Sequence, residues 1–395
     1  MNEAPRTSKT TAGAQTDTRS AARELAPTLR ERADEIEEGR RLPEDLSARF
    51  ASAGFYRMCV PEVYGGLELP PRETMETIET LARADAASAW CVFIAATSGT
   101  VLAMLTEESA RSVFTHPETM LAGVFAPRGK AVVEEDGFRV NGQWQWGSGT
   151  QNADWILAGC QVIRDGDPEL QRNGSPRSRM MLVPASQVEF IDTWHVSGLS
   201  GTGSTDFAIR DVLVPETHAV GLGVDRPLPG PLYTFPQFGL LGMGIAAVAL
   251  GLARAAIEEL IEIAGGKTPS GSARPLAARP AAQTEVAQAE ATLRSARAFY
   301  YEAIDTAWQE ALDGALSTDR RRDIRLATTH ATHACAQAVD RMYNLGGGTS
   351  VYRRSPLQRI FRDVHVATQH MMVGPSTLEL TGRLLLGLET DVSML

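Results

Sequence analysis

The chain has 395 residues, of which 43% are hydrophobic and 22% charged, and its formal net charge is −10. This length permits two or three domains with a large core, and the composition is typical of a soluble globular protein. The acidic balance, without a basic stripe, argues against nucleic-acid binding. The four cysteines are scattered and form no CxxC, which predicts a reducing, cytoplasmic location without disulfides.

The N-terminus and the longest apolar run bear on targeting. Residues 1–20 are polar and lack a hydrophobic signal core, so we expect a disordered tail. The apolar run 238–253 is shorter than the roughly 18–20 residues that a membrane helix needs, and Arg254 follows it directly. A buried core helix is therefore expected, with no membrane attachment.

Residues 21–120 show helical spacing of apolar side chains, with a break at Pro43 and a turn at 60–66, VPEVYGG. From residue 121 to about 225, short β-branched and aromatic runs alternate with Gly, Asp and Asn. This pattern predicts antiparallel strands, with tight turns at Asp136–Gly137 and Asn141–Gly142.

Helical spacing returns over 226–395, where three long helices are predicted at about 238–264, 281–312 and 323–345. The segment between the first two, GGKTPSGSARPLAARP, has the Gly, Ser and Pro content of a loop. The predicted organisation is thus a tail (1–20), a helical domain (21–120), a β domain (121–225) and a helical bundle (226–395).

Four motifs follow one another in chain order: VPEVYGGLELP (60–70), GQWQWGSGTQNADW (142–155), WHVSGLSGTGSTDFAIRDVLVPE (194–216) and the glycine-rich segment 344–370. Together they resemble the acyl-CoA dehydrogenase superfamily over almost the whole chain. The resemblance implies an α+β fold, with an N-terminal α-helical domain, a central antiparallel β domain and a C-terminal four-helix bundle.

The departures from that family concern its catalytic base. Counted from Asp363, the usual glutamate position holds Met371, and the alternative site on the helix at 236–251 contains no acid. The chain is more similar to the two-component (group D) flavin-dependent monooxygenase branch. Matching features are Ser148–Gly149 after two tryptophans, GLSGTGSTD at 198–206, and a late Thr-Gln-His ending at His370.

This resemblance implies an oxygenase component that receives FMNH2 or FADH2 from a separate flavin reductase. It would react with O2 through a C4a-hydroperoxyflavin and hydroxylate an aromatic or heteroaromatic small molecule. Ser148 would contact the flavin, and His370 would act as acid or base, because an ordinary histidine titrates near pH ~6.5. Three alternatives stay open: an N-oxygenase acting on an amine or amino sugar, a dehydrogenase-like FAD enzyme with an atypical base, and a non-catalytic flavoprotein.

The resemblance also implies contacts to the cofactor. Trp146 would pack on the flavin ring beside Ser148 and Gly149, and the hydroxyls of Thr202 and Ser204 suit an anion. A further group would reach the cofactor of a neighbouring subunit, which makes a homotetramer the expected assembly. That group is Ser270, Arg274, Gly346, Gly347 and Gly348.

A set of apolar side chains is expected to line the substrate pocket. The predicted pocket residues are Phe125, Phe235, Phe238, Met371 and Met372.

Three other histidines are further candidates for a functional role. His365 is the reserve for His370, although five residues of helix place the two about 140° apart. His330 and His333 have metal-ligand spacing, but no third ligand stands nearby, and no metal is expected.

Overall fold

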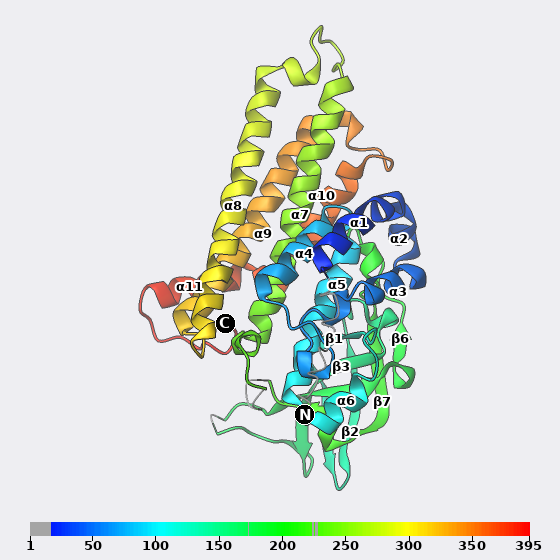
Figure 1. Ribbon diagram of the computed structural model, residues 1–395, viewed down its shortest axis with the longest axis vertical. Helices are drawn as coiled ribbons and strands as arrows, with labels where there is room; N and C mark the ends of the chain where they lie inside the picture. The colour runs from blue at the N-terminus through cyan, green and yellow to red at the C-terminus, as the bar shows by residue number, and fades with distance from the viewer. Residues whose placement is uncertain (1–16, 173, 223–224, 226–227) are drawn as a thin grey trace, which may run out of the picture.

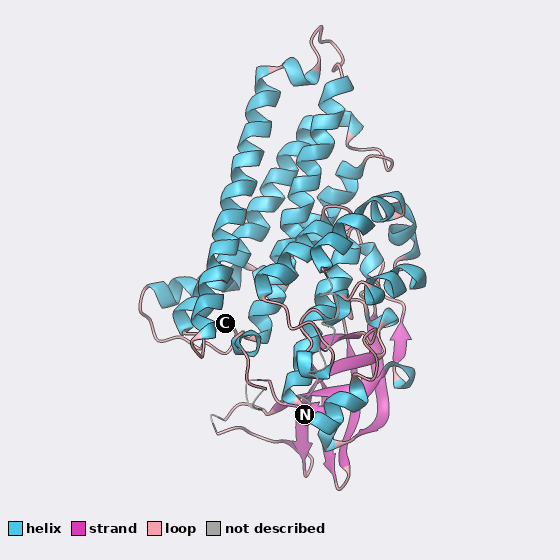
Figure 2. Ribbon diagram, in the orientation of Figure 1, coloured by secondary structure: helices cyan, strands magenta, loops and turns pink. Residues whose placement is uncertain are grey.

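The structure is a computed structural model that describes residues 17–172, 174–222, 225 and 228–395. Helices, a sheet and further helices follow in the predicted order (Figures 1 and 2). The N-terminal helices are α1 (Thr18–Glu31), α2 (Ala33–Gly39), α3 (Glu44–Ser52), α4 (Pro71–Ala82), α5 (Ala86–Ser98) and α6 (Glu107–Val113). The C-terminal helices are α7 (Gln237–Gly266), α8 (Pro280–Leu312), α9 (Thr318–Gly346), α10 (Pro356–Thr368) and α11 (Pro375–Leu385).

The first helix begins earlier than the sequence predicted. The Asp17 side chain accepts a hydrogen bond from the backbone N–H of Ser20, which caps α1 at Thr18. Residues 18–20, predicted to belong to the tail, are therefore helical, and residues 1–16 lie outside the described residues.

The sheet has the order β6-β7-β2-β1-β3-β5-β8, and β4 pairs with β3. One pairing, β1 with β3, is parallel, and the other pairings are antiparallel. The strands are β1 (Leu121–Glu134), β2 (Gly137–Trp144), β3 (Trp155–Arg164), β4 (Asp167–Pro168), β5 (Ser178–Pro184), β6 (Glu189–Ile191), β7 (Asp206–Val214) and β8 (Ala219–Val220).

Of the two predicted turns, only one is present. The chain reverses between β1 and β2 at Glu135–Asp136, directly before Gly137. The turn predicted at Asn141–Gly142 is wrong, because both residues lie within β2, where the register with β7 shifts between Val140 and Gly142. The extra residue is on β7, where Arg210 and Asp211 face Asn141 alone and Asp211 has a φ of 58°.

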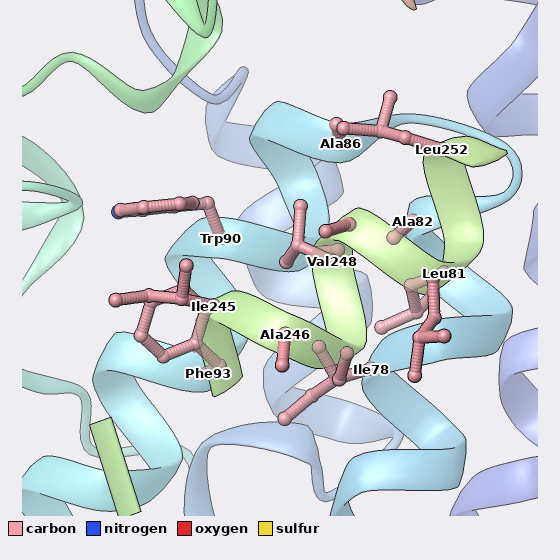
Figure 3. Close-up of a cluster of buried hydrophobic side chains, with 14 of the residues drawn as sticks. Ile78, Leu81, Ala82, Ala86, Trp90, Phe93, Ile245, Ala246, Val248 and Leu252 are labelled. Atoms are coloured by element: carbon pink, nitrogen blue, oxygen red, sulfur yellow. The ribbon is translucent and has the colours of Figure 1, made fainter. Parts of the chain in front are cut away.

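Helix α5 is the buried centre of the helical part, since all thirteen of its residues are buried. Its N-terminus is capped by Asp85, whose carboxylate accepts from the Ser88 N–H at 2.7 Å. Helix α7 packs closely on it, because a Cβ at Gly244 would lie 2.4 Å from the Phe93 ring. Figure 3 shows this cluster, with Trp90 at its edge and its indole nitrogen directed away from α7.

Two helical segments are long and apolar enough to cross a membrane by length and composition alone, namely 86–104 and α7. Their apolar windows are 94% and 89% buried inside the protein. They serve here as core helices, as predicted for the run at 238–253.

Candidate active site

The segment after β2 separates the two tryptophans that the sequence placed together. Trp144 is fully buried, stacks on Phe207 and donates its indole N–H to the Gly159 carbonyl at 2.7 Å. Trp146 is 66% exposed and has a φ of 66°. The strand ends at Trp144, so the chain turns before Trp146. Trp144 is thus a core residue, and Trp146 alone is free to meet a bound ring.

Ser148 is part of a buried chain of hydroxyl groups. The Trp90 indole N–H donates to its Oγ at 3.1 Å, and its Oγ lies 2.6 Å from that of Ser204. The Ser204 Oγ is 2.6 Å from the Thr202 Oγ1, which donates to the Leu199 carbonyl at 2.8 Å. These residues come from α5, the turn after β2 and the 198–206 hairpin.

The donor at one end of this chain and the acceptor at the other fix its direction. Trp90 can only donate, and the Leu199 carbonyl can only accept. Thr202 therefore accepts from Ser204, and Ser204 accepts from Ser148. Ser148 is left with one lone pair that faces no protein donor among its described contacts. Its oxygen can accept one further hydrogen bond.

The hydroxyls of Thr202 and Ser204 consequently do not form the free anion-binding pair that the sequence suggested. Both residues are buried, at 2% and 3% exposure, and their protons are already used. Their observed contacts orient Ser148, and a direct contact of either residue with the cofactor stays a prediction.

The 198–206 hairpin is held on α10 by the Arg362–Asp363 pair. The Asp363 carboxylate accepts from the Leu199 N–H at 2.6 Å, and Arg362 donates to the Ser197 carbonyl at 2.5 Å. A Cβ at Gly198 would lie 2.5 Å from the Arg362 carbonyl, so only glycine fits this contact. Burial raises the pKa of Asp363 to about 7, although the Leu199 hydrogen bond opposes that shift.

His370 follows α10 and faces the same region. Its ring centroid is 6.0 Å from that of Trp90. Its Nδ1 accepts from the backbone N–H of Met372 at 3.2 Å. Because a backbone N–H can only donate, the ring proton of the neutral imidazole is on Nε2.

The pKa of His370 is lower than the ordinary value of about 6.5 that the sequence alone implied. Although part of the residue remains exposed, burial of the ring and, to a smaller extent, the charge of Arg325 together lower its pKa to about 4. Above that pH the imidazole is neutral, with Nδ1 engaged and Nε2–H available as a donor.

His365 faces elsewhere. Its Nε2 lies 2.8 Å from the Asp340 carboxylate on α9, and its ring packs edge-on against Phe361. Of the two candidate histidines, His370 is therefore the one joined to Ser148 through Trp90. His333 is also occupied, since its Nε2 is 2.9 Å from the Val373 carbonyl.

The five predicted pocket residues have different surroundings. Phe235 is buried against Trp308, while Phe125 and Phe238 are partly buried beside the helical core. Met371 is 61% exposed, and Met372 is 3% exposed. Of these residues, Met372 has a direct hydrogen bond to His370. A common substrate pocket formed by all five stays a prediction.

The predicted contacts to a neighbouring subunit's cofactor lie at the end of the bundle remote from the sheet (Figure 1). Ser270 and Arg274 are exposed in the loop after α7, and Gly347 and Gly348 are exposed after α9. The sequence reasoning missed Lys267, whose Nζ donates to the Gly346 carbonyl at 2.5 Å and the Thr349 hydroxyl at 2.7 Å. It brings a positive charge to the three glycines.

Two further residues near the site were missed, and each had a sequence signal. Trp90 has an indole N–H in a helix with no other large polar side chain, so it needed a partner elsewhere. Arg325 stands at helical spacing with Thr328, Thr329 and Thr332, all of which are buried, and is itself 1% exposed. A charged residue on a buried helix face is unusual enough to indicate function.

The residues present fit a reduced flavin. Reduced flavin carries a proton on N5, and the free lone pair of Ser148 is an acceptor for such a donor. Exposed Trp146 offers a flat apolar face beside it. Ser148, Trp146 and Gly149 would hold the ring, which supplies electrons for the reaction with O2.

Comparison with known proteins agrees with this geometry. Residues 13–114 match the family model of the acyl-CoA dehydrogenase N-terminal domain, and residues 243–375 match that of the C-terminal domain. An indole-3-acetate monooxygenase from Pseudomonas putida is 35% identical over 359 residues, covering 91% of this chain and 90% of the relative. The oxygenase subunit HsaA of a flavin-dependent monooxygenase from Mycobacterium tuberculosis is 29% identical, covering 89% and 90%.

Solved structures show the same architecture. The crystal structure of 3-HSA hydroxylase from Rhodococcus sp. RHA1 superposes with a TM-score of 0.87 at 26% identity, covering 96% of this chain and 99% of the other. XiaF from Streptomyces, solved in complex with FADH2 and glycerol, also has a TM-score of 0.87, at 25% identity, covering 95% and 96%.

Proposed function

The chain belongs to the two-component flavin-dependent monooxygenases built on the acyl-CoA dehydrogenase fold, and we propose that its substrate is an aromatic or heteroaromatic small molecule held between Ser148 and His370. Its relatives are oxygenase components that use reduced flavin, FADH2 or FMNH2, supplied by a reductase. In this proposal the chain is likewise the oxygenase component, and a separate reductase supplies its reduced flavin.

The observation that carries the proposal is the directed hydroxyl chain ending at Ser148. It presents an acceptor, not a base, at the position proposed for the flavin, and no described hydrogen bond joins Ser148 to a carboxylate. Met371 occupies the position of the dehydrogenase base, and α7 has no acid before Glu258. A site without a base cannot remove an α-proton from an acyl substrate, but oxygen transfer does not require that step.

The reaction balances with the components named. One atom of O2 enters the substrate as a hydroxyl group, the other leaves as water, and reduced flavin provides two electrons and two protons. Neutral His370 cannot take a substrate proton at Nδ1, because Met372 already donates there. Its Nε2–H can donate to an oxygen or nitrogen of the substrate and so orient the ring.

We also propose that the chain forms a homotetramer. A cavity of about 400 Å³ between α8, α9 and α11 is lined by Phe299, His330 and Leu378 among others. Leu378, Leu385 and Leu386 are exposed nearby on or next to α11. Such an apolar surface suits burial against a second copy in a homotetramer. We further propose a cytoplasmic location, without binding to nucleic acid or membrane.

The test supplies the protein with photoreduced FMN or FAD, 18O2 and a panel of aromatic compounds, in the absence of a reductase. We expect a product heavier by one 18O atom, with hydrogen peroxide below the amount of flavin oxidised. Full conversion of flavin to peroxide with every compound, together with bleaching of bound FAD by an acyl-CoA, would overturn the proposal. An oxygenated nitrogen in the product would identify the N-oxygenase alternative.

A further inference from the structure

Arg325 is a buried cation without a counterion. It is 1% exposed on α9 and forms no ion pair with any residue in the described part of the chain. Its Nη1 donates to the Met372 carbonyl at 3.2 Å and to the Met372 sulfur at 3.4 Å, and its Nη2 donates to the Met394 carbonyl at 2.5 Å. Its Nε–H is buried with no hydrogen-bond partner.

Burying an unpaired charge in this way costs free energy of folding unless another interaction compensates it. A charge removed from water normally requires an opposite charge and a full set of hydrogen bonds. Burial without either lowers the pKa of Arg325 to about 10. Helix α7, which passes Arg325 at Gly242, has no charged residue before Arg254 and so supplies no acid to it.

The guanidinium is also adjacent to the candidate active site. Met372 connects the two groups directly, because its N–H donates to His370 Nδ1 while its carbonyl and sulfur accept from Arg325. The charge of Arg325 is close enough to lower the pKa of His370. On the other side, Gly242 of α7 has no side chain, and a Cβ there would lie 3.3 Å from Nη1.

We propose that Arg325 is the binding site for a carboxylate on the aromatic substrate, so that the enzyme acts on aromatic acids. A carboxylate would take up the unpartnered Nε–H with one oxygen and a hydrogen of Nη2, on the same edge of the guanidinium, with the other. A guanidinium binds a carboxylate through two such parallel hydrogen bonds. His370 and Arg325 then hold the two ends of one substrate.

This inference rests on the proposed function and narrows its substrate to a class. Two relatives are named for indole-3-acetate, an aromatic acid, and the buried, unpaired Arg325 is the observation in this chain that points to such a substrate. A purely structural arginine is the competing explanation, because Arg325 also ties α9 to Met372 and Met394.

The experiment compares indole-3-acetate with its neutral amide, indole-3-acetamide, by calorimetric binding to the wild-type protein and its variants in the presence of anaerobic reduced flavin. The wild type is expected to bind the acid at least ten-fold more tightly than the amide. Arg325→Met is expected to weaken binding of the acid about 100-fold and of the amide less than three-fold. Arg325→Lys should weaken binding of the acid less than Arg325→Met does, because lysine keeps the positive charge. It should still bind the acid more weakly than the wild type, because it lacks the planar guanidinium.

Arg322→Met is the matched control, because Arg322 lies on the same helix but pairs with Asp319 and Asp323. Equal affinity of the wild type for acid and amide overturns the inference, even if Arg325→Met does not fold. Equal loss of both ligands in a folded Arg325→Met protein also overturns it and indicates a structural arginine. Failure of the proposed function is separate, since it would appear as absence of 18O from every product, including those of neutral aromatics.

Discussion

Ser148 is the residue on which, in our proposal, oxygen transfer most directly depends. Replacing it by alanine removes the acceptor of the Trp90 N–H and the lone pair offered to the flavin. We expect Ser148→Ala to lower the yield of hydroxylated product per flavin oxidised by about 10–100-fold, the effect of losing one buried hydrogen bond. Product and peroxide are measured together, and the affinity for reduced flavin is measured in parallel to separate weaker binding from lost coupling.

Ser204→Ala tests the direction of the chain separately. Without Ser204, the Ser148 hydroxyl loses its acceptor and can turn its proton toward the flavin, so product yield should fall by a smaller factor. The exposed serine Ser178 on β5 provides the control. If Ser204→Ala matches wild type while Ser148→Ala is impaired, the orienting role of the chain is wrong.

His370 is predicted to act as a donor through Nε2. His370→Ala should reduce coupling of flavin oxidation to product about 10–100-fold. His370→Gln should recover part of this loss, because its amide N–H reaches the place of Nε2, whereas a lost base could not be replaced by an amide. The product yield should show no histidine inflection near pH 6.5, since the pKa of His370 lies at about 4.

Nitrogen-15 spectra of the histidine ring give a readout without turnover. At pH 7 the His370 signal should be that of a neutral ring with its proton on Nε2. A charged ring at that pH, or a proton on Nδ1, would restore the acid or base role that the sequence suggested.

At the scale of elements, Asp363 joins the 198–206 hairpin to α10. Its pKa is raised from 3.8 to about 7 in the folded protein. The unfolded chain therefore loses this proton at a lower pH than the folded chain, so the stability that the protonated form contributes is lost as the pH rises through about 7. Asp363→Asn keeps an oxygen that accepts from the Leu199 N–H, and it removes this pH-dependent loss of stability.

We therefore expect the melting temperature of Asp363→Asn to depend less on pH between 5 and 8 than that of the wild type. The variant should gain several degrees relative to wild type at pH 8. Scanning calorimetry over this range measures the difference, with exposed Asp136→Asn as the control. An unchanged slope would show that Asp363 is ionised throughout.

At the scale of the whole molecule, the predicted cofactor residues fall into two groups at separate places on one chain. Ser148 and its neighbours lie beside α5, whereas Arg274, Lys267 and the glycines lie at the remote end of the bundle (Figure 1). We propose that a cofactor shared between subunits of a homotetramer accounts for this separation. Light scattering should then give four times the 42.6 kDa chain mass.

Mixed oligomers test the sharing directly. Ser148→Ala and Arg274→Glu chains should each be impaired when alone, but co-expressed chains should regain roughly a quarter of wild-type product yield, because some sites combine two intact halves. Each variant mixed with itself is the control. No recovery in oligomers shown to be mixed would place both groups in one subunit's site, or in none.

The sequence by itself determined the order of elements, the long helices and the absence of a carboxylate base. These follow from periodicity and residue identity, which are local properties of the chain. It also pointed to Ser148 and His370, though only through resemblance to a family. It erred at Asn141–Gly142, because an Asn-Gly pair suits a tight turn but pairing with β7 keeps both residues in a continuous strand.

Only the tertiary structure decided which groups meet and in what protonation state. Ser148 acquires its direction from Trp90, 58 residues earlier, and from Ser204, 56 residues later. His370 becomes a neutral donor because burial of its ring and the charge of Arg325 lower its pKa, while the Met372 N–H occupies Nδ1. Hydrogen-bond direction and pKa depend on neighbours in space and on exclusion of water, and neither is written in local sequence pattern.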